Sequence, residues 1–133
     1  MADKKIVMLV LCRKIITELL VEAIHKRTNL ETFALYEFNR AKDIAMMKKP
    51  NFALVEIPER QGTPAMDAIA VCEEIKEASP GCKIILFCPE NDRESVKAST
   101  KAAKDGKIDD FMFYDLSIDY LVAKLEMMIS DNA

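Results

Sequence analysis

The chain has 133 residues; 50% of them are apolar, 31% are charged, and the formal net charge is -3. This length fits a single domain with its own core, so residues 1–133 are treated as one domain. The composition excludes a disordered, collagen-like or coiled-coil chain. Because a nucleic acid backbone is bound by clustered cations, the acidic balance predicts no nucleic acid partner.

The N-terminal apolar run covers only residues 6–11. It is too short to span a bilayer and lacks the small-residue cleavage site of a signal peptide. We therefore expect a cytoplasmic protein with no membrane partner. The 4 cysteines form no C-x-x-C pair and the single histidine, His25, is given no role. No metal site of the Cys/His type and no cofactor are expected.

Apolar runs typical of buried strands alternate with helical patterns along the chain. Strands are predicted at 6–11, 32–36, 52–57, 83–87 and 110–114. Helices are predicted behind them, over residues 16–26, 41–48, 65–78 and 92–105 and from Ser117 onward. The helix at 92–105 has few apolar positions, so it is expected to be rather exposed.

Five strands alternating with five helices predict right-handed crossovers and a parallel sheet with helices on both faces. The fold class is therefore α/β, a three-layer α/β/α sandwich. In such folds, ligands bind at the carboxyl ends of the strands. The residues expected at that edge are Leu11, Cys12, Glu56, Cys88 and Tyr114.

Several segments resemble the response-regulator receiver (CheY-like) family. Residues 8–16 are similar to its first strand and helix entry, and residues 52–57 to its phosphoacceptor strand. Met66-Asp67-Ala68 resembles its M-D-G turn, and residues 106–114 resemble the stretch around its fifth strand. The resemblance implies the flavodoxin/CheY-like fold with sheet order 2-1-3-4-5. It also implies a place in two-component signalling or a phosphorelay.

Phosphoryl transfer in this family needs an acidic pair for Mg²⁺, an acceptor aspartate, a hydroxyl and a lysine. The resemblance places Leu11 and Cys12 at the acidic pair and Glu56 at the acceptor aspartate. It places Cys88 at the hydroxyl and Tyr114 at the lysine. We therefore expect a degenerate pseudo-receiver that is not an enzyme, has no catalytic residue and holds no metal.

Glu56 has two interpretations. It mimics a phosphorylated aspartate and holds an active-like state, or it is a relic without a signalling role. A carboxylate at a buried strand end must be paired or neutralised. We expect Arg13, Lys14 or Arg60, which lie on adjoining loops, to reach it.

Cys12 precedes a helix and Cys88 is expected on the same edge. One interpretation is a thiol-based redox sensor or small enzyme that uses Cys12; the other is two small residues that fill the space of a lost metal site. By the family's strand order, one strand separates their strands, which puts the Cα atoms about 9–10 Å apart. A disulfide needs less than about 7 Å, so none is expected.

Phe111 stands where the family carries its switch aromatic, on the surface made by the fourth helix, fifth strand and fifth helix. Phe113 and Tyr114 add aromatic residues of the kind enriched at interfaces, although a strand residue can also face the core. The predicted function is phosphorylation-independent interaction with a protein partner or a second copy through this surface, in bacterial signalling. The alternatives are a receiver fragment of a longer response regulator and the thiol-based role of Cys12.

Overall fold

The computed structural model of the chain describes residues 4–59, 61–114 and 117–131. Its centre is a parallel sheet with the strand order β2-β1-β3-β4-β5. The strands are β1 (Ile6–Val10), β2 (Glu31–Leu35), β3 (Phe52–Glu56), β4 (Lys83–Cys88) and β5 (Asp110–Phe113). The predicted fold class and strand order are confirmed.

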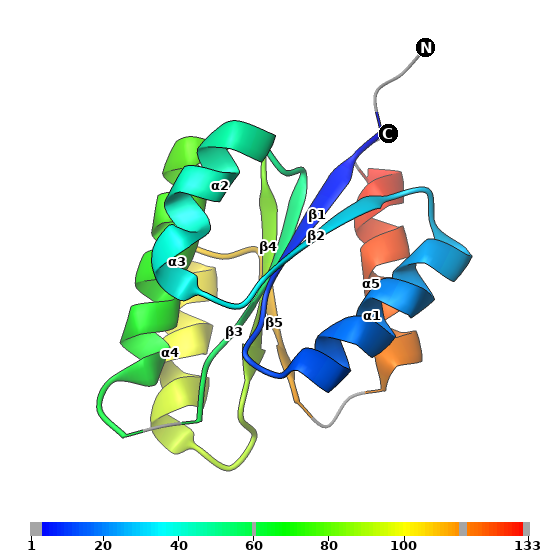
Figure 1. Cartoon of the computed structure of the whole chain (residues 1–133). Helices are drawn as coiled ribbons and strands as arrows, with labels where there is room; N and C mark the ends of the chain where they lie inside the picture. The colour runs from blue at the N-terminus through cyan, green and yellow to red at the C-terminus, as the bar shows by residue number, and fades with distance from the viewer. Residues whose placement is uncertain (1–3, 60, 115–116, 132–133) are drawn as a thin grey trace.

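Helices cover both faces of the sheet, as Figure 1 shows. One face is covered by α1 (Lys14–Arg27) and α5 (Ile118–Asp131). The other is covered by α2 (Ala41–Lys48), which follows a short 3-10 turn (Phe38–Arg40), by α3 (Pro64–Ala78) and by α4 (Arg93–Lys104). Within the described ranges, no helix combines the length and apolar character needed to cross a bilayer.

The alternation of side chains along the strands divides the core into two layers. Val7 and Leu9 pack toward α1 and α5, whereas Met8 and Val10 pack toward α2, α3 and α4. All five residues of β3 are buried, because this central strand is covered on both faces. The continuous apolar runs in the sequence are therefore explained by the two helical layers.

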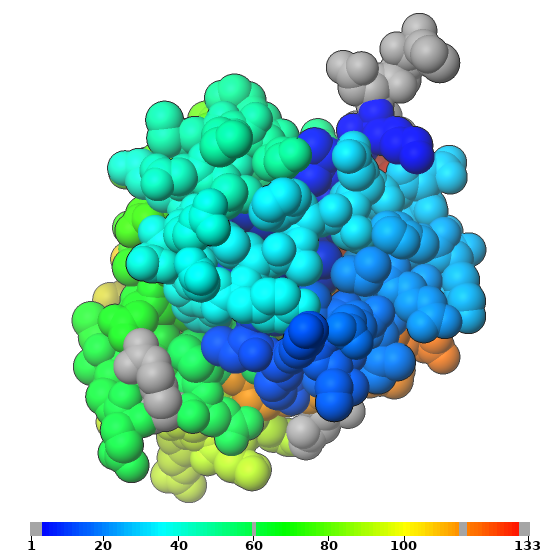
Figure 2. Space-filling view, viewed as in Figure 1, coloured from blue at the N-terminus to red at the C-terminus, as the bar shows by residue number. Residues whose placement is uncertain are grey.

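α1 lies on the face drawn in Figure 2, in blue, beside the cyan segment from β2 to α2. Its buried stripe contains Leu20 and Ile24. Leu19, the apolar residue next to Leu20, is 46% exposed. Neighbouring residues on a helix point about 100° apart, so a stripe centred on Leu20 and Ile24 turns Leu19 toward solvent.

α4 differs from the expectation in which residues it buries. Its buried residues are Ser95, Ser99 and Ala102. Val96 and Ala98 are partly buried at the edge of the core. Small side chains let α4 approach the sheet closely, and the Ser95 hydroxyl donates to Asp92 Oδ2 at 2.7 Å. Burial of hydroxyls rather than aliphatic groups is why the apolar pattern of this helix is weak.

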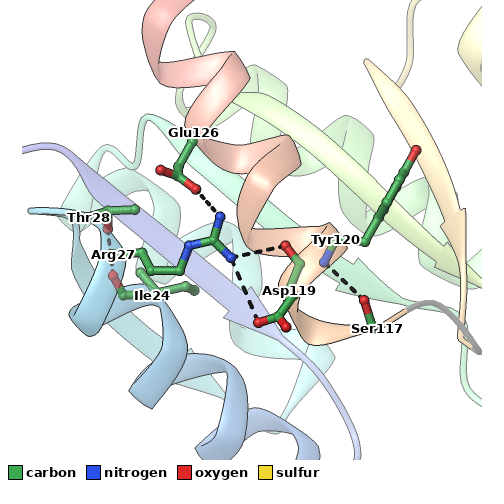
Figure 3. A network of polar contacts seen from close by, with 7 residues as sticks. All are labelled: Ile24, Arg27, Thr28, Ser117, Asp119, Tyr120 and Glu126. Carbon is green, nitrogen blue, oxygen red and sulfur yellow. Dashed lines mark hydrogen bonds and ion pairs between the residues drawn. The ribbon is translucent and has the colours of Figure 1, made fainter.

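A polar cluster joins α1 to α5 (Figure 3). Arg27, in the last turn of α1, forms an ion pair with Glu126 and donates from Nη1 to the Asp119 carbonyl oxygen at 3.2 Å. The last helix was predicted from Ser117 onward, and Ser117 caps α5, because its hydroxyl accepts from the Tyr120 backbone N–H at 3.1 Å. The Arg27 contacts join the two helices of this layer at their solvent side, and the Ser117 cap fixes the start of α5.

Candidate functional site

The predicted site residues meet at the carboxyl edge of the sheet, the lower edge in Figure 1. Parallel pairing sets Glu56 beside Phe87 and Cys88 beside Phe113. The Tyr114 backbone N–H then donates to the Cys88 carbonyl oxygen at 3.2 Å. The register therefore brings the ends of β1, β3, β4 and β5 to one place, as expected for this class of sheet.

Glu56 is the buried charged group of this edge, with 3% of the residue exposed. Its Oε1 accepts from the Cys12 backbone N–H at 2.9 Å. Its Oε2 accepts from Arg13 Nε at 2.7 Å, which is also an ion pair. The prediction that a loop cation reaches Glu56 is confirmed, with Arg13 as the partner. Arg60, another candidate, lies outside the described residues.

Arg13 is placed by the start of α1. It is the N-cap residue, with extended backbone angles, and its carbonyl oxygen accepts from both the backbone N–H and the hydroxyl of Thr17, at 3.0 and 2.8 Å. α1 has no acidic residue in its first turn. The Glu56 carboxylate supplies the negative charge that the N-terminal end of a helix favours. Both α1 and Arg13 are thus held by one side chain of β3.

Tyr114 covers the other side of the Arg13 guanidinium. Arg13 Cζ lies 4.4 Å from the centre of the Tyr114 ring, a cation–π contact. The Tyr114 hydroxyl is buried and has no hydrogen-bond partner among the described residues. Burial, reinforced by the nearby Glu56 carboxylate, raises the pKa of Tyr114 well above its ordinary value. The phenol therefore stays neutral and stacks on one face of the guanidinium, while 42% of the Arg13 side chain remains exposed.

The residues at this edge do not fit the Mg²⁺ ion that receiver domains bind there. Leu11 is buried in the apolar layer under α1 and α5. Cys12 offers a thiol where a hard cation needs oxygen ligands. Each carboxylate oxygen of Glu56 already accepts a hydrogen bond, one of them from a guanidinium at 2.7 Å. A divalent cation at this place would be repelled by that positive charge.

The two cysteines of the edge have different surroundings. Cys88 is a fully buried free thiol, and burial raises its pKa above the ordinary value. Cys12 is exposed at the surface. The interpretation of small buried residues filling an old metal site therefore describes Cys88 and does not describe Cys12.

A hollow of about 530 Å³ opens beside Tyr114, between the loops that follow β3 and β4. Pro58, Pro64 and Pro89 contribute its apolar walls, and Glu59, Glu90 and Asp92 its acidic groups. This acidic lining opposes the approach of an anionic phosphodonor to the carboxyl edge.

Phe111 and Phe113 are half-buried and pack against the core layer under α2, α3 and α4. Their rings meet edge to face, with centroids 6.1 Å apart. Both therefore point to the α4 side of β5, while Met112 between them is buried on the α5 side. They sit where α4 and β5 adjoin, each with part of its surface in the core.

The sequence placed Leu11, Cys12, Glu56, Cys88 and Tyr114 on one edge, and the structure brings them together there. The stacking of Tyr114 on Arg13 was missed. The available signal was that Tyr114 stands at the position of the family's lysine while Arg13 lies on a neighbouring loop. The sequence alone does not give the direction of the Tyr114 ring.

No protein-family model matches the sequence, and no curated protein matches it. Solved structures do match it in fold. A response regulator from Thermotoga maritima is 19% identical with a TM-score of 0.74, over 96% of this chain and 99% of that one. The signal receiver domain of a putative Luxo repressor protein from Vibrio parahaemolyticus is 12% identical with a TM-score of 0.77, over 97% and 92%.

A third similar structure is described as belonging to a family of redox sensors in the streptococci that evolved from two-component response regulators. It is 13% identical, with a TM-score of 0.77, and the match covers 96% of this chain and 52% of that one. At these identities the likeness shows the fold, which is that of response-regulator receiver domains.

Proposed function

We propose that this chain is a pseudo-receiver that acts in two-component-type signalling by binding a protein partner without being phosphorylated. The observation that carries the proposal is the Arg13–Glu56 ion pair at the position of the phosphoacceptor. In a receiver, a phosphoryl group would bring negative charge to this edge and a lysine would meet it. Here a carboxylate and an arginine of the chain itself hold that arrangement.

The geometry of Glu56 supports this proposal. Phosphorylation would require an oxygen of the acceptor to attack the phosphorus of a donor, with metal ions or cations neutralising the donor's oxygens. Both Glu56 oxygens accept hydrogen bonds, and the side chain is 3% exposed. Tyr114 covers the guanidinium, and the nearby hollow is lined with carboxylates. A donor therefore meets a carboxylate whose two oxygens are both hydrogen-bonded, and Leu11 and Cys12 supply no carboxylate for a metal ion.

The proposed partner surface is formed by α4, β5 and α5. Phe111 and Phe113 lie at its centre, half-buried. Tyr120 and Met127 on α5 are 55% and 62% exposed and lie seven residues apart, on one side of the helix. Asp110 and Lys124 form an ion pair between β5 and α5. Exposed aromatic and methionine side chains around charged groups are typical of protein interfaces.

The test is a backbone amide NMR spectrum recorded with and without Mg²⁺ and acetyl phosphate, with a phosphorylation-competent receiver treated in parallel. We expect the resonances of Phe111 and Phe113 to stay unchanged in this protein and to move at the corresponding positions of the control. Replacement of Arg13 by methionine should move them, because it releases Glu56. Shifts caused by the phosphodonor in the unmodified chain would overturn the proposal.

A thiol-based role remains a second candidate because Cys12 is exposed at the carboxyl edge, and one structure with the same fold is described as a redox sensor. Cys72, Cys82 and Cys88 are buried. Labelling with a chromogenic disulfide reagent at neutral pH separates the candidates. Rapid reaction of one thiol, lost in Cys12→Ser, would support the redox role; an inert Cys12 would exclude it.

A further inference from the structure

The outer face of α4 carries a row of four cations: Arg93, Lys97, Lys101 and Lys104. All four residues are exposed. Their spacing of four, four and three residues keeps them on one side of the helix. In the described parts of the chain, none of them forms an ion pair. We call this set the basic row.

The basic row is unfavourable for α4 in isolation. Like charges four residues apart repel each other on a helix. Cations are favourable near the C-terminal end of a helix, which accounts for Lys101 and Lys104. Arg93 stands at the first position of α4, at the end where a cation is unfavourable. The stability of α4 therefore does not explain Arg93 and Lys97.

α3 has the opposite arrangement. Its outer side contains Met66, Ala70, Glu73 and Glu77, all exposed. Glu73 and Glu77 are like charges four residues apart, in the second half of the helix, where a carboxylate is unfavourable. Glu73 has one ion pair, to Lys107 at 3.3 Å, and both of these side chains are more than 40% exposed. We call Glu73 and Glu77 the acidic pair.

One copy of the chain cannot join the basic row to the acidic pair. α3 and α4 lie side by side and run in the same direction, because each follows a strand of a parallel sheet (Figure 1). A groove of about 570 Å³ between them is lined by Met66, in the first turn of α3, and by Lys97 and Lys101 of α4. Glu73 lies instead beside Lys107, beyond the last residue of α4. The misplaced charges are thus at opposite ends of the helix pair.

We propose that two copies of this chain associate through α3 and α4 about a two-fold axis perpendicular to these helices. The rotation sets α4 of one copy antiparallel to α3 of the other. The N-terminal cations of α4 then face the C-terminal carboxylates of α3. Arg93 meets Glu77 of the second copy, and Lys97 meets Glu73 of the second copy. Arg93 and Lys97 are four residues apart on α4, and Glu73 and Glu77 are four residues apart on α3. Both spacings are about 6 Å along the helix axis, so the two sets of charges are in register.

The same rotation places apolar surface near the axis. Met66 is 68% exposed at the rim of the groove, and Ala65 and Ala98 line the groove. Because the interface is isologous, every contact occurs twice. This surface shares α4 with the proposed partner surface but extends to α3 instead of β5. The inference does not depend on the state of Glu56.

The size of the surface sets the expected strength. Two adjacent helices, each about 10 Å wide and about 20 Å long, offer roughly 400 Å² per copy. This is about half of a standard interface, so the dimer should be weak and transient. Its charge pairs are solvent-exposed and therefore screened by salt. We expect the dissociation constant to rise at least about tenfold between 50 and 500 mM NaCl.

The experiment is sedimentation velocity of the full chain at concentrations up to about 500 μM, at both salt concentrations. R93E/K97E reverses the two N-terminal cations of the basic row, and E73K/E77K reverses the acidic pair. Each variant alone should be monomeric. An equimolar mixture should form a dimer, because each copy then offers the charges that the other lacks. K42E/K48E on α2 is the matched control and should dimerise like the unmodified chain.

Three results would overturn the inference. The first is an unmodified chain that stays monomeric at the highest concentration in 50 mM NaCl. The second is a dimer that neither reversal weakens, including one that is lost only on replacement of Tyr120 and Met127. The third is a mixture of the two reversed variants that remains monomeric while both keep the circular dichroism spectrum of the folded chain. Adding acetyl phosphate should change none of these measurements, so failure here is distinct from failure of the proposed function.

Discussion

Two carboxylates lie at opposite edges of the sheet, and each accepts the same kinds of hydrogen bond. Glu56 ends β3 at the carboxyl edge and accepts from a backbone N–H and from Arg13. Asp109 precedes β5 at the amino edge, where Oδ2 accepts from the Ile84 backbone N–H at 2.8 Å and from Lys76 Nζ at 2.9 Å. In each case one side chain ties two segments together and is neutralised by one close cation.

The difference between them is burial. Glu56 is 3% exposed, whereas the Asp109 side chain is 27% exposed and has a second cation, Lys83, at 4.0 Å. Any buried carboxylate needs a partner, so pairing alone does not indicate signalling. The carboxyl edge is distinguished by a fully buried acid that depends on one arginine covered by an aromatic ring. Four substitutions test the contrast between the two edges.

The largest effect is expected for Arg13→Met. It leaves Glu56 buried with a backbone N–H as its remaining partner and should lower the free energy of unfolding by about 2 kcal/mol, the range for hydrogen bonds to charged groups. Urea unfolding at pH 7 measures this. Glu56→Gln in the Arg13→Met background should recover part of the loss, since no unpaired charge remains. No recovery would mean that Arg13 acts through packing on Tyr114.

The next largest effect is expected on the free energy of unfolding above pH 10. The pKa of Tyr114 is raised in the folded state, while it stays near 10.0 in the unfolded chain. Above pH 10 the unfolded phenol ionises and the folded one does not, so stability falls as the pH rises. By pH 11 the free energy of unfolding should fall by at most about 1.4 kcal/mol, because solvent around the half-buried ring screens part of the effect.

Tyr114→Phe should remove that part of the pH dependence. It should also raise stability at pH 7, because the hydroxyl has no partner in the described structure. Tyr120→Phe is the exposed control and should leave the alkaline slope unchanged. Equal slopes in the unmodified chain and in Tyr114→Phe would contradict the burial of the phenol.

Asp109→Asn tests the amino edge. The amide oxygen can still accept from Ile84, so the change isolates the charge opposite Lys76 and Lys83. We expect a loss of about 1 kcal/mol in urea unfolding, less than for Arg13→Met, because all three groups contact solvent. A loss larger than that of Arg13→Met would reverse the ranking of the two edges.

The smallest effect is expected for Arg27→Met in the α1–α5 cluster (Figure 3). Arg27 and its partners are partly exposed, with 35% of the Arg27 side chain accessible. The loss should be at most about 0.5 kcal/mol, as for other surface ion pairs. It is the matched control for Arg13→Met, and comparable losses in the two variants would mean that burial of Glu56 has no special weight.

The fold was predictable because its strands are continuous apolar runs such as 6–11 and 52–57, which only a doubly covered sheet accommodates. The position of Glu56 on the carboxyl edge followed from the same pattern. The side-chain contacts at this edge could not be predicted from the sequence pattern. The stacking of Tyr114 on Arg13 depends on side-chain directions at two loop junctions, which no periodicity records. The buried face of α4 was missed because Ser95 and Ser99 are buried through close packing, and hydropathy does not reveal this.

We propose that the carboxyl edge of the sheet cannot accept a phosphoryl group. The most direct test is intact mass spectrometry after incubation of the full chain with acetyl phosphate and Mg²⁺, beside Glu56→Gln and a phosphorylation-competent receiver. We predict no phosphoryl adduct on this chain and a clear one on the competent receiver. An adduct that appears on the unmodified chain and is absent from Glu56→Gln would contradict the account.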